Sequence, residues 1–182
     1  INIIRKKKPM TSTRERVLQT LLRKPKSTIN ELAEADRVKL MVENPTRRID
    51  YQRQESTAVW RAVAPFILRE QDEGRDLVVE GVAVLPELMS QLEDIPHRVV
   101  FIGNQGENHK ENIKKSAEEN EHDWMRGVSD QYIGAFAAFV KRMSAYIEQE
   151  AKKYGFEYIE MDKELFGDVT EEVMKSLGLS AR

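Results

Sequence analysis

Short runs of β-branched and other apolar residues alternate along the chain with longer segments whose apolar positions repeat at helical spacing. The apolar runs are typical of strands buried on both faces and predict strands at 77–84, 98–103 and 156–161. The helical periodicity predicts long helices at 55–73 and 131–154. Pro65 is expected to kink the first of these helices. Ser129 is expected to cap the second, and Gly155 to close it.

Strands separated by helices indicate parallel pairing through right-handed crossovers. The predicted fold class is therefore α/β, a layered parallel sheet with crossover helices, preceded by a basic helical segment. We expect residues 1–53 to form this N-terminal segment and residues 54–182 to form the α/β domain. Within the first segment, Asn44-Pro45 ends a helix and 46–50 is expected to be a loop.

The distribution of charge along the chain also changes after residue 53. Residues 1–53 contain 14 Lys/Arg and 6 Asp/Glu, a net charge of +8, so the remainder carries −10 within a total of −2. A basic segment of this kind indicates either an arm for an anionic partner such as nucleic acid, or a helical hairpin that packs on the acidic remainder.

Residues 14–35 resemble the opening of winged helix-turn-helix DNA-binding domains, in which a first helix precedes a short helix with a Ser/Thr cap. A recognition helix should follow a turn after Ala35. Residues 36–40 instead continue the same helical pattern. A DNA-binding domain without a recognition helix has no element to place in the major groove. The sequence favours the hairpin over sequence-specific DNA binding.

Glu80 follows the apolar run at 77–79 directly. A carboxylate is costly to bury without a partner, and the carboxyl ends of strands in open α/β sheets line the ligand crevice. Asp162 ends the third predicted strand in the same way. Glu80 is therefore a candidate catalytic residue, and the alternative is an ordinary ion pair at the sheet edge.

A polar excursion at 104–128 follows the second predicted strand and carries Lys110, Lys114, Lys115 and Arg126. Cations on a mobile flap can close over transferring phosphates and neutralise the developing charge, as in a phosphotransferase with a lid. The alternative is a solvated surface. His109 and His122 lie 13 residues apart, which fits no compact metal-binding pattern, so no metal-ligating residues are predicted.

The segment from Glu55 to Asp162 resembles the later part of P-loop small-molecule kinases. The matching stretches are LVVEGVAVLPELM (77–89), VVFIGN (99–104), HKENIKKSAEE (109–119), HDWM (122–125) and the long segment at 129–162. The nearest group is the 2-phosphoglycerate kinase-like one, and more broadly the adenylate-kinase-like and zeta-toxin-like kinases.

This resemblance implies ATP-dependent phosphoryl transfer to a small metabolite or nucleotide, with ATP and Mg²⁺ as cofactors. It makes Glu80 the catalytic residue at the end of a Walker-B-like strand. It also implies a lid at 105–127, in which Lys110 and Arg126 cover the phosphates, and a closing helix on which Arg142 faces the nucleotide.

The sequence departs from this family in lacking GxxxxGKS or GxxxxGKT, whose backbone and Lys cradle the phosphates. Two interpretations follow: the P-loop lies upstream of residue 1, or the chain is a remodelled, inactive relative. In the second case it is a non-enzymatic binding protein whose basic N-terminal helices contact nucleic acid or a protein partner. An incomplete sheet would also expose an edge, which leaves homo-oligomers open.

Composition sets the remaining expectations. The chain has no Cys and no run of about 18 apolar residues, so disulfides and a transmembrane helix are not predicted. Residues 1–4 are too short for the apolar region of a signal peptide. A cytoplasmic protein without a membrane partner is expected.

Overall fold

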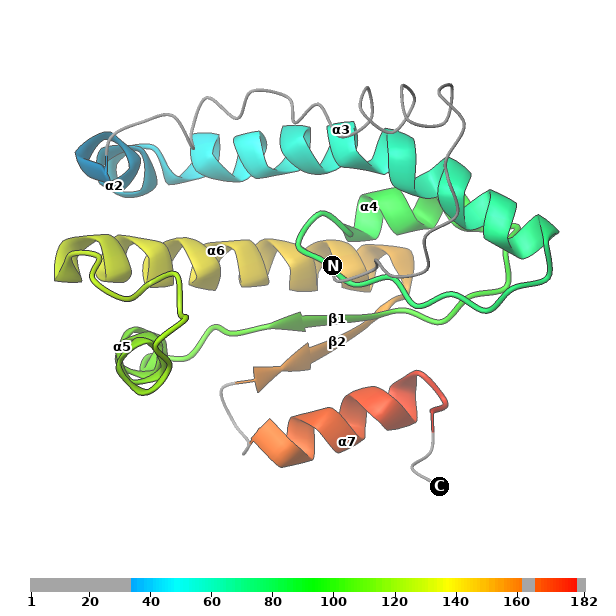
Figure 1. Cartoon of the computed structure of the whole chain (residues 1–182). Helices are drawn as coiled ribbons and strands as arrows, with labels where there is room; N and C mark the ends of the chain where they lie inside the picture. Colours follow the sequence, from blue (N-terminus) through cyan, green and yellow to red (C-terminus); the bar gives the residue numbers. More distant parts are fainter. Residues whose placement is uncertain (1–33, 162–165, 180–182) are drawn as a thin grey trace, which may run out of the picture.

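Helices make up most of the structure, a computed structural model that describes residues 34–161 and 166–179 (Figure 1). In chain order its elements are α2 (Glu34–Glu43), α3 (Pro45–Asp72), α4 (Pro86–Met89), the 3₁₀ helix η1 (Ser90–Leu92), β1 (Val100–Gly103), α5 (His109–Glu119), α6 (Asp130–Tyr154), β2 (Glu157–Glu160) and α7 (Phe166–Ser176). The winged-helix-like stretch up to residue 33 and the carboxylate of Asp162 lie outside the described residues.

The sheet consists of β1 and β2, which pair in parallel from Val100 opposite Glu157 to Gly103 opposite Glu160. Helix α6 covers one face of this pair and α7 lies against the other (Figure 1). Two strands with helical connections were predicted here correctly. The predicted layered parallel sheet is wrong, because the described residues are mostly helical and contain only this two-stranded sheet.

The predicted strand at 77–84 does not form. Residues 75–80 have no regular secondary structure, and Val78 and Val82 are 76% and 82% exposed. A strand exists only through hydrogen bonds to a neighbouring strand, and no strand in the described ranges pairs with this segment. Its β-branched residues therefore show β-propensity without a partner.

Helix α3 also differs from expectation. Residues 46–50, predicted as a loop, belong to a helix of 28 residues that starts with Pro45 in its first turn and continues through Pro65. Proline in the first turn favours a helix start, because its missing N–H needs no partner there. The expected boundary after residue 53 consequently lies inside α3.

Helix α6 begins and ends as predicted. The Ser129 hydroxyl accepts a hydrogen bond from the Tyr132 backbone N–H at 3.1 Å, and Gly155 has the left-handed conformation, with φ of 74°. Helix α6 lies between the sheet on one side and α2 and α3 on the other (Figure 1). No helix in the described ranges combines the length and apolar character that crossing a membrane requires.

Three arginines attach α2 and α3 to α6. Each lies over an aromatic ring of α6, and these rings are seven residues apart: Arg37 over Tyr132 at 5.2 Å, Arg48 over Phe139 at 4.3 Å and Arg53 over Tyr146 at 5.3 Å. We call this set the arginine–aromatic ladder. The ladder shows that residues 34–53, the described part of the basic segment, pack on α6.

The Arg53–Tyr146 pair of the arginine–aromatic ladder also involves a carboxylate, that of Glu87. Arg53 Nε donates to Glu87 Oε1 at 3.1 Å, and the Tyr146 hydroxyl donates to the same oxygen. Burial and this hydrogen bond raise the pKa of Tyr146. Glu87 Oε2 is buried without a hydrogen-bond partner, so Arg53 is the main compensation for the Glu87 charge.

Arg48 occupies a different environment. Its Nη1 atom is buried without a hydrogen-bond partner, and desolvation lowers the pKa of its guanidinium. The favourable contact with the Phe139 ring therefore competes with a desolvation cost.

We predict that Arg53→Met destabilises the protein more than Arg48→Met does. Losing Arg53 leaves the Glu87 carboxylate without its cation, and we expect a loss of about 2 kcal/mol, below the value for a fully buried pair because Arg53 is 46% exposed. Losing Arg48 removes a desolvated charge together with its ring contact, so a change within about 1 kcal/mol is expected. Urea unfolding measures both, and the reverse order would contradict this account.

Candidate functional site

The carboxyl ends of β1 and β2 are where ligands bind in many α/β proteins, but internal hydrogen bonds fill this place here. Gln105 donates its backbone N–H to Glu160 Oε1 at 2.9 Å and its side-chain amide to Glu148 Oε2 at 2.8 Å. The Tyr158 hydroxyl donates to Glu160 Oε2 at 2.9 Å. The Glu148 and Glu160 carboxylates already accept these hydrogen bonds. Their two negative charges disfavour a phosphate ligand at this edge of the sheet.

Gly103, the last residue of β1, makes this network possible. A Cβ at this position would overlap the Tyr158 hydroxyl and would lie 2.8 Å from Ser144 Cβ, inside the packed layer between the sheet and α6. Gly134 on α6 is different, because a Cβ there would meet the nearest atom, Lys110 Cε, at an ordinary 3.6 Å.

We therefore predict opposite effects of the same substitution at the two glycines. Gly103→Ala should lower the free energy of unfolding by about 1–3 kcal/mol through overpacking. Gly134→Ala should raise it by about 0.5–1 kcal/mol, because alanine loses less conformational entropy in a helix. The urea midpoints of the two variants test this, and equal shifts would contradict the packing described.

A second concave region lies where α5 packs on the first turns of α6 and has a volume of about 350 Å³. Its lining comes from α5, from the turn that joins α5 to α6, and from α6 itself: Lys114, Ala117, Glu118, Met125, Arg126, Gly127, Val128, Asp130 and Ile133. We call it the α5–α6 hollow.

Cationic groups gather at the α5–α6 hollow. Lys110 Nζ lies 2.8 Å from Asp130 Oδ2, and Lys114 contacts the other oxygen of the same carboxylate. Arg126 is exposed and forms no ion pair with any described residue. Lys110 and Lys114 share the Asp130 carboxylate, whereas Arg126 lies in the lining together with Glu118. With Lys110 beside the lining, three cations stand against two carboxylates, and this small positive balance suits an anionic group.

Asp123 holds the turn that presents Arg126. Its carboxylate accepts the Met125 backbone N–H at 2.8 Å and the Ser116 hydroxyl at 3.3 Å, while its carbonyl accepts the Arg126 backbone N–H at 3.0 Å. Met125 is 4% exposed and anchors the turn in the core. The backbone that carries Arg126 is therefore tied to α5 at one end and to the core at its centre.

Asp123→Ala should loosen this turn. The substitution removes two side-chain hydrogen bonds, which should make local opening of the turn more favourable by roughly 1 kcal/mol. We therefore expect tryptic cleavage after Arg126 to become about fivefold faster. Glu121→Ala is the matched control, since Glu121 is exposed on the same turn and its ion pair among the described residues is with the exposed His122. Equal cleavage rates in all three proteins would show that Asp123 does not hold the turn.

The predicted site residues do not all meet. Lys110 and Arg126 lie at the same end of α6, beside the α5–α6 hollow. Arg142 is exposed further along α6, and Glu80 is exposed in the irregular segment before α4. No contact in the described structure joins either of them to the hollow.

Sequence reasoning missed Asp130 as the shared partner of Lys110 and Lys114. Asp130 looks like an ordinary first-turn residue of α6, which favours acidic side chains through the helix dipole. Lys110 precedes it by 20 residues, so no local spacing indicates the pair. Only the packing of α5 against α6 brings them together.

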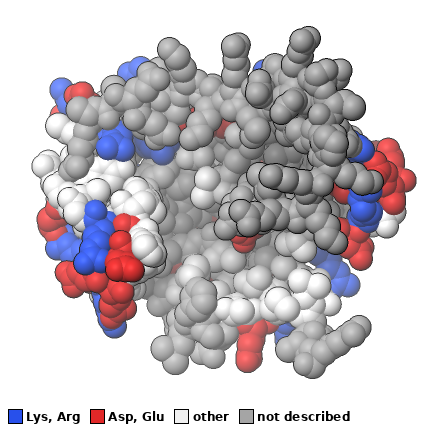
Figure 2. Space-filling view, in the orientation of Figure 1, with Lys and Arg blue, Asp and Glu red and all other residues white. Residues whose placement is uncertain are grey.

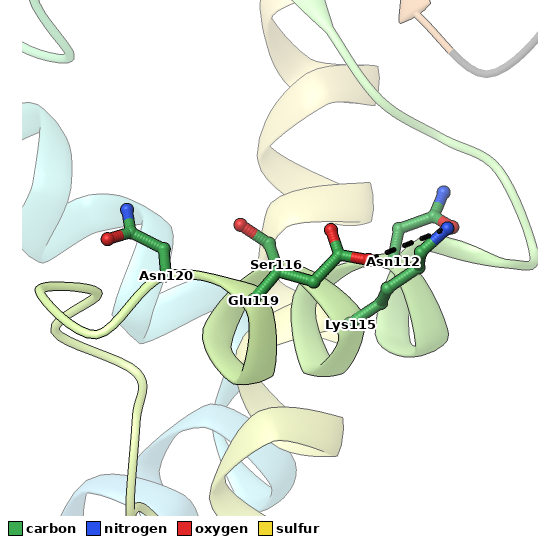
Figure 3. A pocket seen from close by; sticks show the side chains of 5 residues that line it. All are labelled: Asn112, Lys115, Ser116, Glu119 and Asn120. Atoms are coloured by element: carbon green, nitrogen blue, oxygen red, sulfur yellow. Dashed lines mark ion pairs between the residues drawn. The ribbon is translucent and has the colours of Figure 1, made fainter.

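A further concave patch lies on the outer face of α5 (Figure 3). Its Lys115 pairs with Glu119 at 3.9 Å, as the dashed line shows, and Ser116 already donates to Asp123. The Asn120 side-chain oxygen accepts the His122 backbone N–H. Since its polar groups serve the helix and the following turn, this patch is a solvated helix face.

Positive and negative side chains are interspersed around α5, on the left of Figure 2. The cations of the α5–α6 hollow are therefore a local cluster, and the described side chains on this face make no broad basic surface of the kind that binds nucleic acid.

Comparison of the chain with protein-family models, with curated proteins and with solved structures gave no match. The functional assignment accordingly depends on the site itself and on the sequence motifs.

The cofactors implied by the kinase resemblance fit the site unequally. Among the described residues, no group of three or more His, Cys, Asp or Glu side chains could hold a metal ion, and the Walker A sequence is absent. The described side chains therefore do not fit Mg²⁺ with a triphosphate cradle. Lys110, Lys114 and Arg126 fit a phosphate group.

Proposed function

We propose that this chain binds the phosphate group of a small metabolite or nucleotide in the α5–α6 hollow, as the lid-bearing part of a phosphotransferase. The observation that carries the proposal is that Lys114 and Arg126 line one hollow, with Lys110 beside it on the carboxylate of Asp130. The resemblance of residues 105–127 to a kinase lid supports the reaction class.

Arg126 is the principal ligand in this proposal. A guanidinium without an ion-pair partner can form two parallel hydrogen bonds to phosphate oxygens, and its supporting turn limits the entropy lost on binding. Lys110 and Lys114 are held close by Asp130 and supply positive charge, which phosphoryl transfer needs around the transferring group. Glu80 and Arg142 receive no role, because neither contacts the hollow.

The test is calorimetric titration of the full chain with inorganic pyrophosphate and with ATP. We expect binding that weakens as the salt concentration rises. Arg126→Ala should lower the affinity about tenfold, since a hydrogen bond to a charged group contributes about 1.5 kcal/mol. Asp130→Asn should raise it several-fold, because two lysines lose their competing carboxylate.

Lys115→Ala is the matched control, since Lys115 lies on α5 but outside the α5–α6 hollow and pairs with Glu119. Its affinity for pyrophosphate should equal that of the unmodified chain. If pyrophosphate does not bind, or if Arg126→Ala binds it as tightly as the unmodified chain does, the proposal is wrong.

The alternative was a non-enzymatic binding protein whose basic N-terminal helices contact nucleic acid or a protein partner, and its nucleic-acid form gains no support from the described residues. Arg37, Arg48 and Arg53 lie over aromatic rings of α6, and Arg53 also pairs with Glu87. These arginines stabilise the fold, so the described part of the segment offers little free positive charge to a polyanion.

A further inference from the structure

Glu118 adds a carboxylate to the cations of the α5–α6 hollow. It lies in the lining together with Arg126 and Lys114, and its side chain is exposed. Lys114 precedes Glu118 by four residues on α5, the spacing at which opposite charges on one helix face usually pair. Lys114 contacts the Asp130 carboxylate instead. Among the described residues, Glu118 is therefore left without a cation.

Arg126 lines the same hollow, and it pairs neither with Glu118 nor with any other described carboxylate. Glu118 stands on α5, whereas Arg126 stands on a turn whose backbone is fixed by Asp123. The two side chains are thus positioned independently. One hollow therefore presents two opposite charges that the described structure does not neutralise, and both are open to a ligand.

Most of the remaining lining is apolar. Ala117, Met125 and Ile133 line the hollow and are only 5%, 4% and 6% exposed, so they form a surface anchored in the core. Such a surface favours contact with a short hydrocarbon chain. The volume of about 350 Å³ is near the lower limit of the roughly 300–1,000 Å³ that ligand pockets have, which suits a small ligand.

We propose that the ligand of the α5–α6 hollow is a small free phosphate monoester that also carries a protonated amine. Its phosphate meets Arg126 and the lysines, its amine pairs with Glu118, and its methylene groups lie on the apolar lining. The inference rests on the proposed function and adds the class of ligand to it. Glu118 attracts the amine and repels phosphates that carry negative charge alone, so it provides specificity.

The first experiment is calorimetric titration of the full chain with 3-aminopropyl phosphate and with propyl phosphate, which differ only in the amine. We expect 3-aminopropyl phosphate to bind about fivefold more tightly, the effect of an ion pair with an exposed carboxylate. Equal affinities, or tighter binding of propyl phosphate, would overturn the inference.

The second experiment uses Glu118→Gln, which keeps the shape of the side chain and removes its charge. The affinity for 3-aminopropyl phosphate should fall about fivefold, to that of propyl phosphate. The affinity for pyrophosphate should rise about twofold, because a repelling carboxylate is lost. A purely structural role of Glu118 would weaken the binding of both ligands, and that result would contradict the proposal.

Glu119→Gln is the matched control. Glu119 is the next carboxylate on α5, but it belongs to the outer face of the helix and pairs with Lys115 (Figure 3). Its substitution should leave the affinities for 3-aminopropyl phosphate and pyrophosphate unchanged. A loss of the amine preference in this variant as well would show that the preference does not come from the hollow.

The headgroup of phosphatidylethanolamine also combines a phosphate with an amine. Its phosphate is a diester with one negative charge, whereas a free monoester carries nearly two at neutral pH and matches the cations of the hollow better. In sedimentation with vesicles of phosphatidylethanolamine and phosphatidylcholine, the full chain should therefore stay in the supernatant. Sedimentation with the vesicles would overturn the assignment to a free ligand and identify a lipid headgroup as the source.

The outcomes separate the two proposals. Pyrophosphate binding without any preference for 3-aminopropyl phosphate over propyl phosphate would overturn the role of Glu118 and leave the phosphate site standing. Absence of pyrophosphate binding would overturn both.

Discussion

The arginine–aromatic ladder is the interaction on which the rest of the structure depends. Helix α6 supports the sheet with one side and receives α2 and α3 on the other, and the ladder joins these layers at three points spaced by about two helical turns. A guanidinium over a ring gains up to about 2 kcal/mol where water is excluded. The lowered pKa of Arg48 shows that desolvation opposes this gain in the middle of the ladder.

The candidate site depends on the same helix. The first turn of α6 provides Asp130 and Ile133 to the lining of the hollow. Tyr132, which carries the first arginine of the ladder, also stacks with Phe136. The ring that receives the first arginine of the ladder therefore belongs to a continuous group of rings on the first turns of α6.

Local signals in the sequence were sufficient for some elements. Ser129 and Gly155 mark the ends of α6, and the runs that become β1 and β2 have the expected parallel pairing. The segment at 77–84 has equally strong β-propensity, yet it forms no strand, because pairing depends on a neighbour that no local pattern specifies. The helix at 46–50 was missed, and its Arg48 lies over the Phe139 ring, about 90 residues later, in a contact that no local pattern indicates.

The same limit applies to the site. Lys110 and Arg126 were identified from the charge of the excursion, and the structure places both beside one hollow. Asp130 was not identified as the partner of Lys110, because the two residues are 20 positions apart in the sequence.

The exposed segment LVVEGVAV has a consequence for the behaviour of the protein at high concentration. Short windows with high β-propensity, no proline and little charge associate with copies of themselves when they are accessible, and Val78 and Val82 are largely exposed. Glu80 places a negative charge in the centre of this window, and Asp76 and Pro86 flank it. Like-charge repulsion between stacked copies opposes self-association, so Glu80 acts as a gatekeeper against aggregation.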